Sequence, residues 1–156
     1  MKKLPIITAN ENYDAALVFA DGSFFLGQGI GKFGRTRGEV CINTAITGYQ
    51  EILSDPSYTG QIINFTFPHI GNVGANIYDM ESDHKFANGL IIRDKITKAS
   101  NFRSESDFDA FLRKHSITGI SGIDTRAITN KIRDNGFVNA VIFFGHQGQE
   151  IDINFF

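Results

Sequence analysis

The segment Ile42–Asn76 constrains the fold most, because it lacks the regular apolar spacing of a long helix or strand. Its glycines allow positive φ without steric cost, and Asp55-Pro56-Ser57-Tyr58 is a turn signal, since Asp accepts from the backbone and Pro presets φ. Long irregular segments in small domains are usually functional or disordered. The many large apolar residues along this segment argue against disorder. We therefore expect an ordered, functional segment.

Length and charge narrow the class of protein. A chain of 156 residues is typical of one domain and buries about 68–70% of its unfolded surface, so it needs no disulfide or metal to fold. A net charge of -2 argues against a nucleic-acid partner, and no apolar run reaches the roughly 18 residues of a membrane span. A single Cys and the short apolar stretch after Met1-Lys2-Lys3 indicate no disulfide and no signal peptide. We expect a cytoplasmic protein.

Residue patterns predict a mixed α and β domain in the order β, α, β. Residues 1–13 are expected to be a flexible lead, and residues 14–156 the domain. Expected strands cover residues 15–20, 23–30, 40–43, 61–66, 89–92 and 137–144, with a hairpin turn at Asp21-Gly22 and a Gly- and Arg-rich turn at 31–38.

Helices are expected at three places. A short helix is possible at Tyr49–Leu53. A longer helix starts near Ser104, with an apolar face formed by Phe108, Phe111 and Leu112. Another is capped by Asp124 and ends at Asn135-Gly136.

Gly29–Gly34 matches the G-x-G-x-x-G pattern of dinucleotide-binding loops. Such a loop needs a helix immediately after it, because the helix N-terminus holds the pyrophosphate. Arg35-Thr36-Arg37-Gly38 and a further β-rich run follow instead. The pattern therefore indicates a glycine-rich turn between strands.

Cys41, His69 and His84 can each be interpreted either as structural residues or as part of a reactive or metal site. Cys41 lies in a predicted strand, where Cys is more often a small core residue than a reactive thiol. His69 could act as a general base, but no nucleophile lies beside it. His84 follows Asp79, Glu81 and Asp83 in a spacing that fits no recognised metal site, so a solvated acidic loop is favoured.

Several polar residues at element ends are expected to form salt bridges or caps, or to contact a partner subunit. They are Arg93, Asp94, Asn101, Arg103, Asp124 and Arg126. Ser57, taken alone, is a turn residue.

Five stretches in order resemble the N-terminal domain of the small subunit of glutamine-hydrolysing carbamoyl phosphate synthetase. They are NTAITGYQEILSDPSY, FPHIGNVGAN, GLIIRD (Gly89–Asp94), SNFR (Ser100–Arg103) and GISGIDTRAIT (Gly119–Thr129). The resemblance runs from about Asp14 to Val141 and implies a three-layer β/β/α swivelling domain, with mixed sheets and two main helices.

The resemblance also implies a role. In the family, the small subunit hydrolyses glutamine, and a large subunit uses the ammonia, bicarbonate and two ATP to make carbamoyl phosphate for arginine and pyrimidine synthesis. The attacking Cys lies in a C-terminal class I amidotransferase domain, which is absent from this chain, so no residue here is expected to be catalytic and the isolated chain is expected to be inactive.

The resemblance implies one substrate contact in this chain. Ser57 occupies the position of the family serine that lies against the amidotransferase domain and helps to bind L-glutamine. It implies no cofactor or metal in this chain, because ATP and Mg belong to the large subunit. The expected partners are that subunit and the amidotransferase domain.

Two alternatives stay open. The chain could be a stand-alone, non-catalytic binding or assembly module of the same fold, ending at Phe156. It could also be a hydrolase that uses Cys41 and His69.

Overall fold

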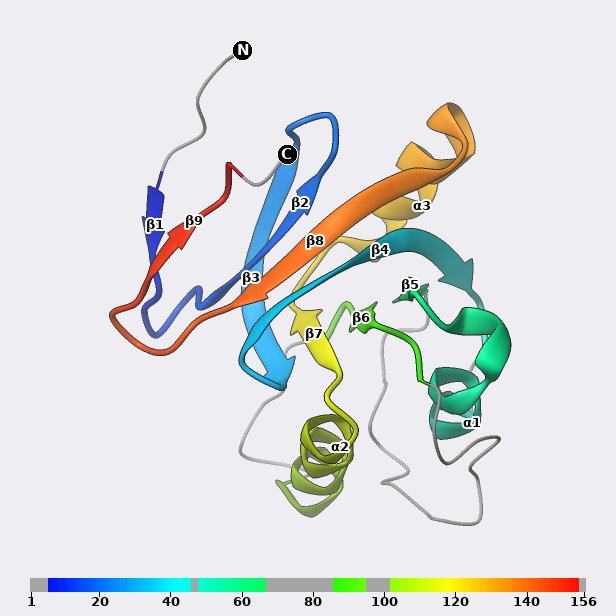
Figure 1. Ribbon diagram of the computed structural model, residues 1–156, viewed down its shortest axis with the longest axis horizontal. Coiled ribbons are helices and arrows are strands. Elements are labelled where there is room, and N and C mark those ends of the chain that lie inside the picture. Colours follow the sequence, from blue (N-terminus) through cyan, green and yellow to red (C-terminus); the bar gives the residue numbers. More distant parts are fainter. Residues whose placement is uncertain (1–5, 46–47, 67–85, 95–101, 155–156) are drawn as a thin grey trace.

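A closed β-barrel lies at the centre of the computed structural model, which describes residues 6–45, 48–66, 86–94 and 102–154 (Figure 1). Its strands lie in the order β2-β3-β7-β6-β5-β4-β8. Their bounds are β2 Ala15–Phe19, β3 Phe24–Gly31, β4 Gly34–Asn43, β5 Gln61–Phe65, β6 Gly89–Ile91, β7 Thr118–Ser121 and β8 Val138–Phe144. A two-stranded sheet pairs β1 (Ile6–Thr8) with β9 (Glu150–Asp152).

The barrel combines an antiparallel and a parallel part. Strands β2, β3 and β8 pair antiparallel with their neighbours, whereas β4, β5, β6 and β7 pair parallel with one another. Parallel neighbours need a crossover connection. Between β4 and β5 the chain forms α1 (Tyr49–Ser54) and the 3₁₀ turn η1 (Pro56–Tyr58), and between β6 and β7 it forms α2 (Phe102–Lys114). The helix α3 (Thr125–Asn135) follows β7.

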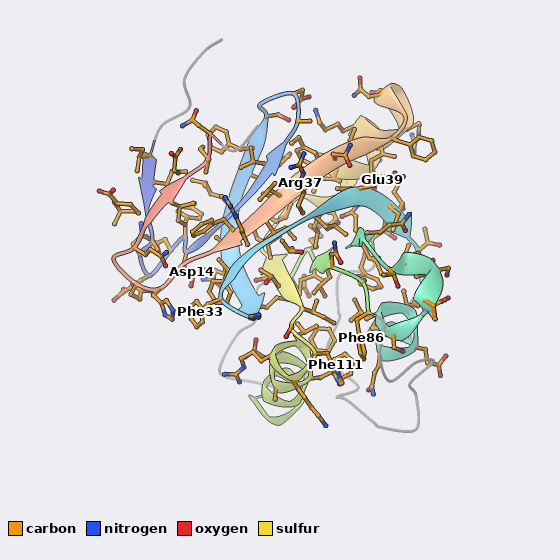
Figure 2. The ribbon with its side chains drawn as sticks, viewed as in Figure 1. Asp14, Phe33, Arg37, Glu39, Phe86 and Phe111 are labelled. Atoms are coloured by element: carbon orange, nitrogen blue, oxygen red, sulfur yellow. The ribbon has the colours of Figure 1, made fainter. Side chains whose placement is uncertain are left out.

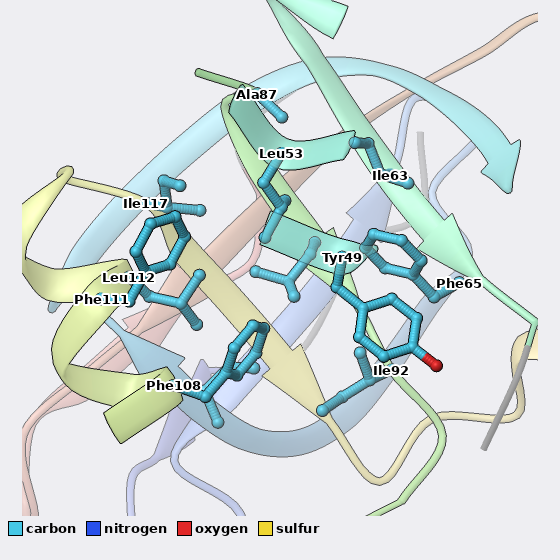
Figure 3. Packing of buried hydrophobic residues seen from close by; sticks show 12 residues of the cluster. Tyr49, Leu53, Ile63, Phe65, Ala87, Ile92, Phe108, Phe111, Leu112 and Ile117 are labelled. Atoms are coloured by element: carbon cyan, nitrogen blue, oxygen red, sulfur yellow. The ribbon is translucent and has the colours of Figure 1, made fainter. Parts of the chain in front are cut away.

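Alternation along the strands sorts the buried side chains into clusters on opposite sides of the barrel wall. On β5, Ile62 belongs to a cluster with the α3 residue Ile128, whereas Ile63 packs outside, toward α1 and α2. Figure 3 shows the outer cluster, in which Tyr49 of α1 meets Phe65 edge to face with ring centroids 5.5 Å apart. Helices α1 and α2 therefore cover one face of the parallel strands.

The sheet of β1 and β9 covers the face of β2 that points away from the barrel interior. All five residues of β2 are buried, because Leu17 packs inside the barrel while Ala16 and Val18 pack against Ile151 and Ile153. The sequence predicts an irregular, flexible lead at residues 1–13, which is wrong for 6–8, since these form β1. The short strand gives almost no alternation signal and depends on β9, far away in the chain.

Most expected elements are confirmed, and with them an α/β fold class. The β2–β3 hairpin turns at Asp21-Gly22, where Gly22 has φ +89°. The cap of α3 is Asp124, whose side chain accepts from the Ala127 amide at 3.1 Å, and Gly136 ends that helix. Helix α2 begins at Phe102, slightly before Ser104. The finer three-layer swivelling arrangement, with two main helices, stays a prediction.

Two strands differ from what the sequence predicts. Residues 31–38 are predicted as a turn, but β4 begins at Gly34 and pairs with β8 from there. The half-buried residues of this part are Thr36 and Gly38, so it shows no apolar alternation. Strand β7 is missed altogether, because its four residues include Thr118, Gly119 and Ser121 and give no apolar run.

Tight packing between β3 and β8 gives a stability prediction. A Cβ built on Gly29 would lie 2.1 Å from Cδ1 of Phe144, far inside van der Waals contact. We expect Gly29→Ala to lower the free energy of unfolding by about 1–3 kcal/mol, measured by urea denaturation. Combined with Phe144→Leu, which shortens the obstructing ring, the loss should be about 1 kcal/mol or more smaller than the sum of the single losses. Additive losses would contradict this packing.

Candidate functional site

The predicted glutamine-binding residue, Ser57, lies on η1 and is exposed to solvent. The carboxylate oxygen Oδ1 of Asp55 accepts from the Ser57 amide at 2.9 Å and from the Ser57 hydroxyl at 2.7 Å. These hydrogen bonds hold the pKa of Asp55 below its ordinary value, because they stabilise the charged carboxylate. The Ser57 hydroxyl is therefore oriented, and its oxygen can still accept a hydrogen bond.

The turn that carries Ser57 is anchored to the barrel on both sides. Tyr58 Oη lies 3.3 Å from Nδ2 of Asn43, the last residue of β4. On the other side, the Leu53 carbonyl accepts from the Ala87 amide at 2.8 Å, and Ala87 also bridges to Thr59. The fold thus fixes an exposed serine on a short turn between buried elements.

Cys41 is a poor nucleophile in this structure. It lies on β4, packs against the cluster around α1 and α2, and its Sγ is 3.7 Å from the Ile62 carbonyl oxygen. Burial, with a smaller contribution from the Glu39 charge, raises the pKa of the thiol to about 11. This agrees with a structural role for Cys41.

The G-x-G-x-x-G pattern forms the turn from β3 to β4, as predicted, and no helix follows it. Its amides are occupied within the fold: Gly29 donates to Asp14 Oδ1 at 2.7 Å, and Gly31 donates to Asp109 Oδ1 at 2.6 Å. Figure 2 shows Asp14 and Phe33 at this end of the barrel. These glycines serve close packing rather than a dinucleotide.

Two candidate residues, His69 and His84, lie outside the described residues, as do Asp79, Glu81, Asp83 and Asn101. Within the part that the structure describes, no three His, Cys, Asp or Glu side chains gather as a metal would require. Among the same residues, no helix has the length and apolar character to cross a bilayer.

A pocket of about 390 Å³ with threonine, arginine and asparagine residues in its lining was not predicted as a site. It is lined by Thr44, Thr66, Arg93, Thr125, Arg126, Thr129, Asn130 and Arg133. Arg93 and Arg126 are expected to form salt bridges or caps, or to contact a partner subunit; neither forms a salt bridge with any residue that the structure describes. The signal that could have found the pocket is the position of Thr44, Thr66 and Arg93, each within two residues of the carboxyl end of a parallel strand.

Comparison with known proteins points to one family. Residues 17–142 match the family model described as carbamoyl-phosphate synthase small chain, CPSase domain. A carbamoyl phosphate synthase small chain from Polynucleobacter asymbioticus is 51% identical over 138 residues, which cover 88% of this chain and 35% of that protein.

Two further relatives have the same printed name. The protein from Zymomonas mobilis is 52% identical, with 85% of this chain and 36% of the relative covered. The one from Bartonella bacilliformis is 53% identical, with 90% and 36% covered. The chain thus spans about a third of the length of the curated relatives it matches.

The Asp55–Ser57 contact predicts a pH response. Because hydrogen bonds from Ser57 lower the pKa of Asp55, we expect Ser57→Ala to raise that pKa toward its ordinary value, measured by the ¹³C shift of the carboxyl group in an NMR titration. Ser23→Ala is the matched control, because Ser23 makes the same two hydrogen bonds to Asp21 instead of Asp55. It should leave the pKa of Asp55 unchanged. An unchanged pKa of Asp55 in Ser57→Ala would contradict the geometry.

The burial of Cys41 predicts slow alkylation. With a thiol pKa about two units higher than in the unfolded chain, the folded protein holds about a hundredfold less thiolate at pH 8. We expect iodoacetamide to label native Cys41 at least tenfold more slowly than the urea-unfolded chain, as followed by intact mass. Equal rates would show that the thiol is accessible and reactive.

Proposed function

The chain belongs to the carbamoyl-phosphate synthase small-chain family, and we propose that it is the N-terminal domain of a glutamine-hydrolysing small subunit. The family match covers most of the chain and the relatives are about half identical to it, which supports this proposal over a stand-alone module. As part of this proposal, the domain adopts the family's three-layer swivelling fold.

The proposed reaction belongs to an assembly larger than this chain. The small subunit releases ammonia from glutamine in the cytoplasm, and the large subunit uses it with bicarbonate and two ATP to make carbamoyl phosphate for arginine and pyrimidine synthesis. Because the chain corresponds to about a third of its relatives, we assign the attacking Cys to a C-terminal amidotransferase domain outside the matched region. ATP and Mg belong to the large subunit, and the 156-residue chain alone hydrolyses no glutamine.

The role of this domain is to dock on the large subunit and to complete the glutamine site with Ser57. The observation that carries this assignment is the exposed, oriented Ser57 hydroxyl on a turn anchored to β4 and to Ala87. Since that hydroxyl already donates to Asp55, the free capacity of its oxygen is as an acceptor. It therefore suits the α-ammonium group of glutamine.

This assignment predicts a selective effect on glutamine. In the complete synthetase, Ser57→Ala removes one hydrogen bond to a charged group, so the KM for glutamine should rise about tenfold or more. Carbamoyl phosphate synthesis supplied with free ammonia should not change, because it bypasses the glutamine site. Both rates are measured in a coupled assay of phosphate release.

Ser23→Ala is the matched control, because Ser23 makes the same bonds to Asp21 on the hairpin turn of β2 and β3. It should leave the KM for glutamine unchanged. An unaltered KM in Ser57→Ala would contradict the role of Ser57. An equal loss of glutamine- and ammonia-dependent synthesis would point to a general structural defect instead.

A further inference from the structure

The pocket lined by the three arginines lies where the parallel strands end. Thr44 directly follows β4, Thr66 directly follows β5, and Arg93 follows β6 by two residues. The chain leaving β7 enters α3 at Thr125. The crevice beyond the carboxyl ends of parallel strands is where α/β sheets generally bind ligands, because several strands deliver side chains to one place.

Helix α3 supplies the rest of the lining from one face. Arg126, Asn130 and Arg133 are four and three residues apart, which places them on the same side of a helix. Thr125 and Thr129, also four residues apart, lie beside them. Three parallel strand ends and one face of α3 thus converge on a single pocket.

The charge of the lining is one-sided. Three arginines line the pocket, and no Asp or Glu among the residues that the structure describes lines it with them. Within the described residues, neither salt bridge of the structure involves these arginines: one joins Arg113 to Asp109 and the other joins Lys131 to Asp21. Guanidinium groups present planar pairs of donors that match phosphate and carboxylate oxygens. The cavity therefore has the chemistry of an anion site.

A buried hydrogen-bond network fixes the wall of the pocket. Asn64 of β5 is fully buried, and its Nδ2 lies 3.2 Å from both the Thr125 carbonyl oxygen and the Thr129 hydroxyl. Thr129 in turn donates to the Thr125 carbonyl at 2.9 Å. These bonds hold the first turns of α3 against β5, so Arg126 and Arg133 project from a helix that is already held in place.

We propose that this pocket binds a small-molecule anion through its phosphate or carboxylate groups. A cavity of about 390 Å³ exceeds the size of a single phosphate, so the ligand class is a small polyanion such as a phosphorylated metabolite or a polycarboxylate. The site is separate from Ser57, which does not line it, and the proposal does not rest on glutamine binding.

Calorimetric titration of the full chain at low ionic strength tests the proposal, with pyrophosphate as the phosphate probe and citrate as the carboxylate probe. Saturable binding of one molecule per chain by either probe is expected, and the stronger probe identifies the ligand chemistry. If neither pyrophosphate nor citrate binds saturably at concentrations up to about 10 mM, the proposal is overturned.

Variants locate the site. Arg126→Gln and Arg133→Gln, both at exposed positions of α3, should each weaken binding about tenfold, and Arg93→Gln tests the same pocket from another element. Arg113→Gln removes the same charge from α2, outside the pocket, and should change binding less than about twofold. Equal weakening in Arg113→Gln would mean diffuse charge attraction and overturn the site. Thermal unfolding checks that each variant folds.

Discussion

The pairing of β4 with two different neighbours is the constraint on which the rest of the structure depends. From Gly34 to Val40 this strand runs antiparallel to β8, and from Glu39 to Asn43 it runs parallel to β5. It thereby joins the antiparallel part of the barrel to the parallel part. Gly38 lies near the change of partner, where a Cβ would meet the Gly60 carbonyl oxygen at 2.4 Å. A side chain at this position would push β5 and its turn away.

The positions of the Ser57 turn and of the arginine pocket both follow from where β4 and its parallel neighbours end. Asn43 at the end of β4 holds Tyr58 and so fixes the turn that presents Ser57, while its side chain also accepts from the Ala45 amide at 2.8 Å. The next residue, Thr44, opens onto the arginine pocket. One strand end therefore supports the proposed glutamine contact on one side and the proposed anion site on the other.

Local signals in the sequence predicted what depends on few neighbours. The Asp21-Gly22 hairpin and the Asp124 cap are made by residues adjacent in the chain, and both are present. The Asp55-Pro56-Ser57 turn is likewise local, but its role in glutamine binding rests on family resemblance and stays a proposal. The family assignment itself depended on long matching stretches rather than on physical patterns.

What the sequence missed depends on distant pairing. Strand β1 needs β9, the first half of β4 needs β8, and β7 is buried by its neighbours despite polar and glycine residues. The arginine pocket was missed for the same reason, since its residues come from separate strands and a helix. Helix packing shows the effect too: Phe86 meets Phe111 of α2 with ring centroids 6.2 Å apart, across a large separation in sequence (Figure 2).

Because it pairs with both β8 and β5, we expect β4 to make the two parts of the barrel one cooperative unit. Native-state hydrogen exchange in increasing denaturant tests it most directly, because it gives an opening free energy for each strand. We predict that amides of β5 and β6 merge into the same unfolding transition as those of β2 and β8. Opening of the parallel strands at a clearly lower free energy, with β2 and β8 still protected, would contradict this account.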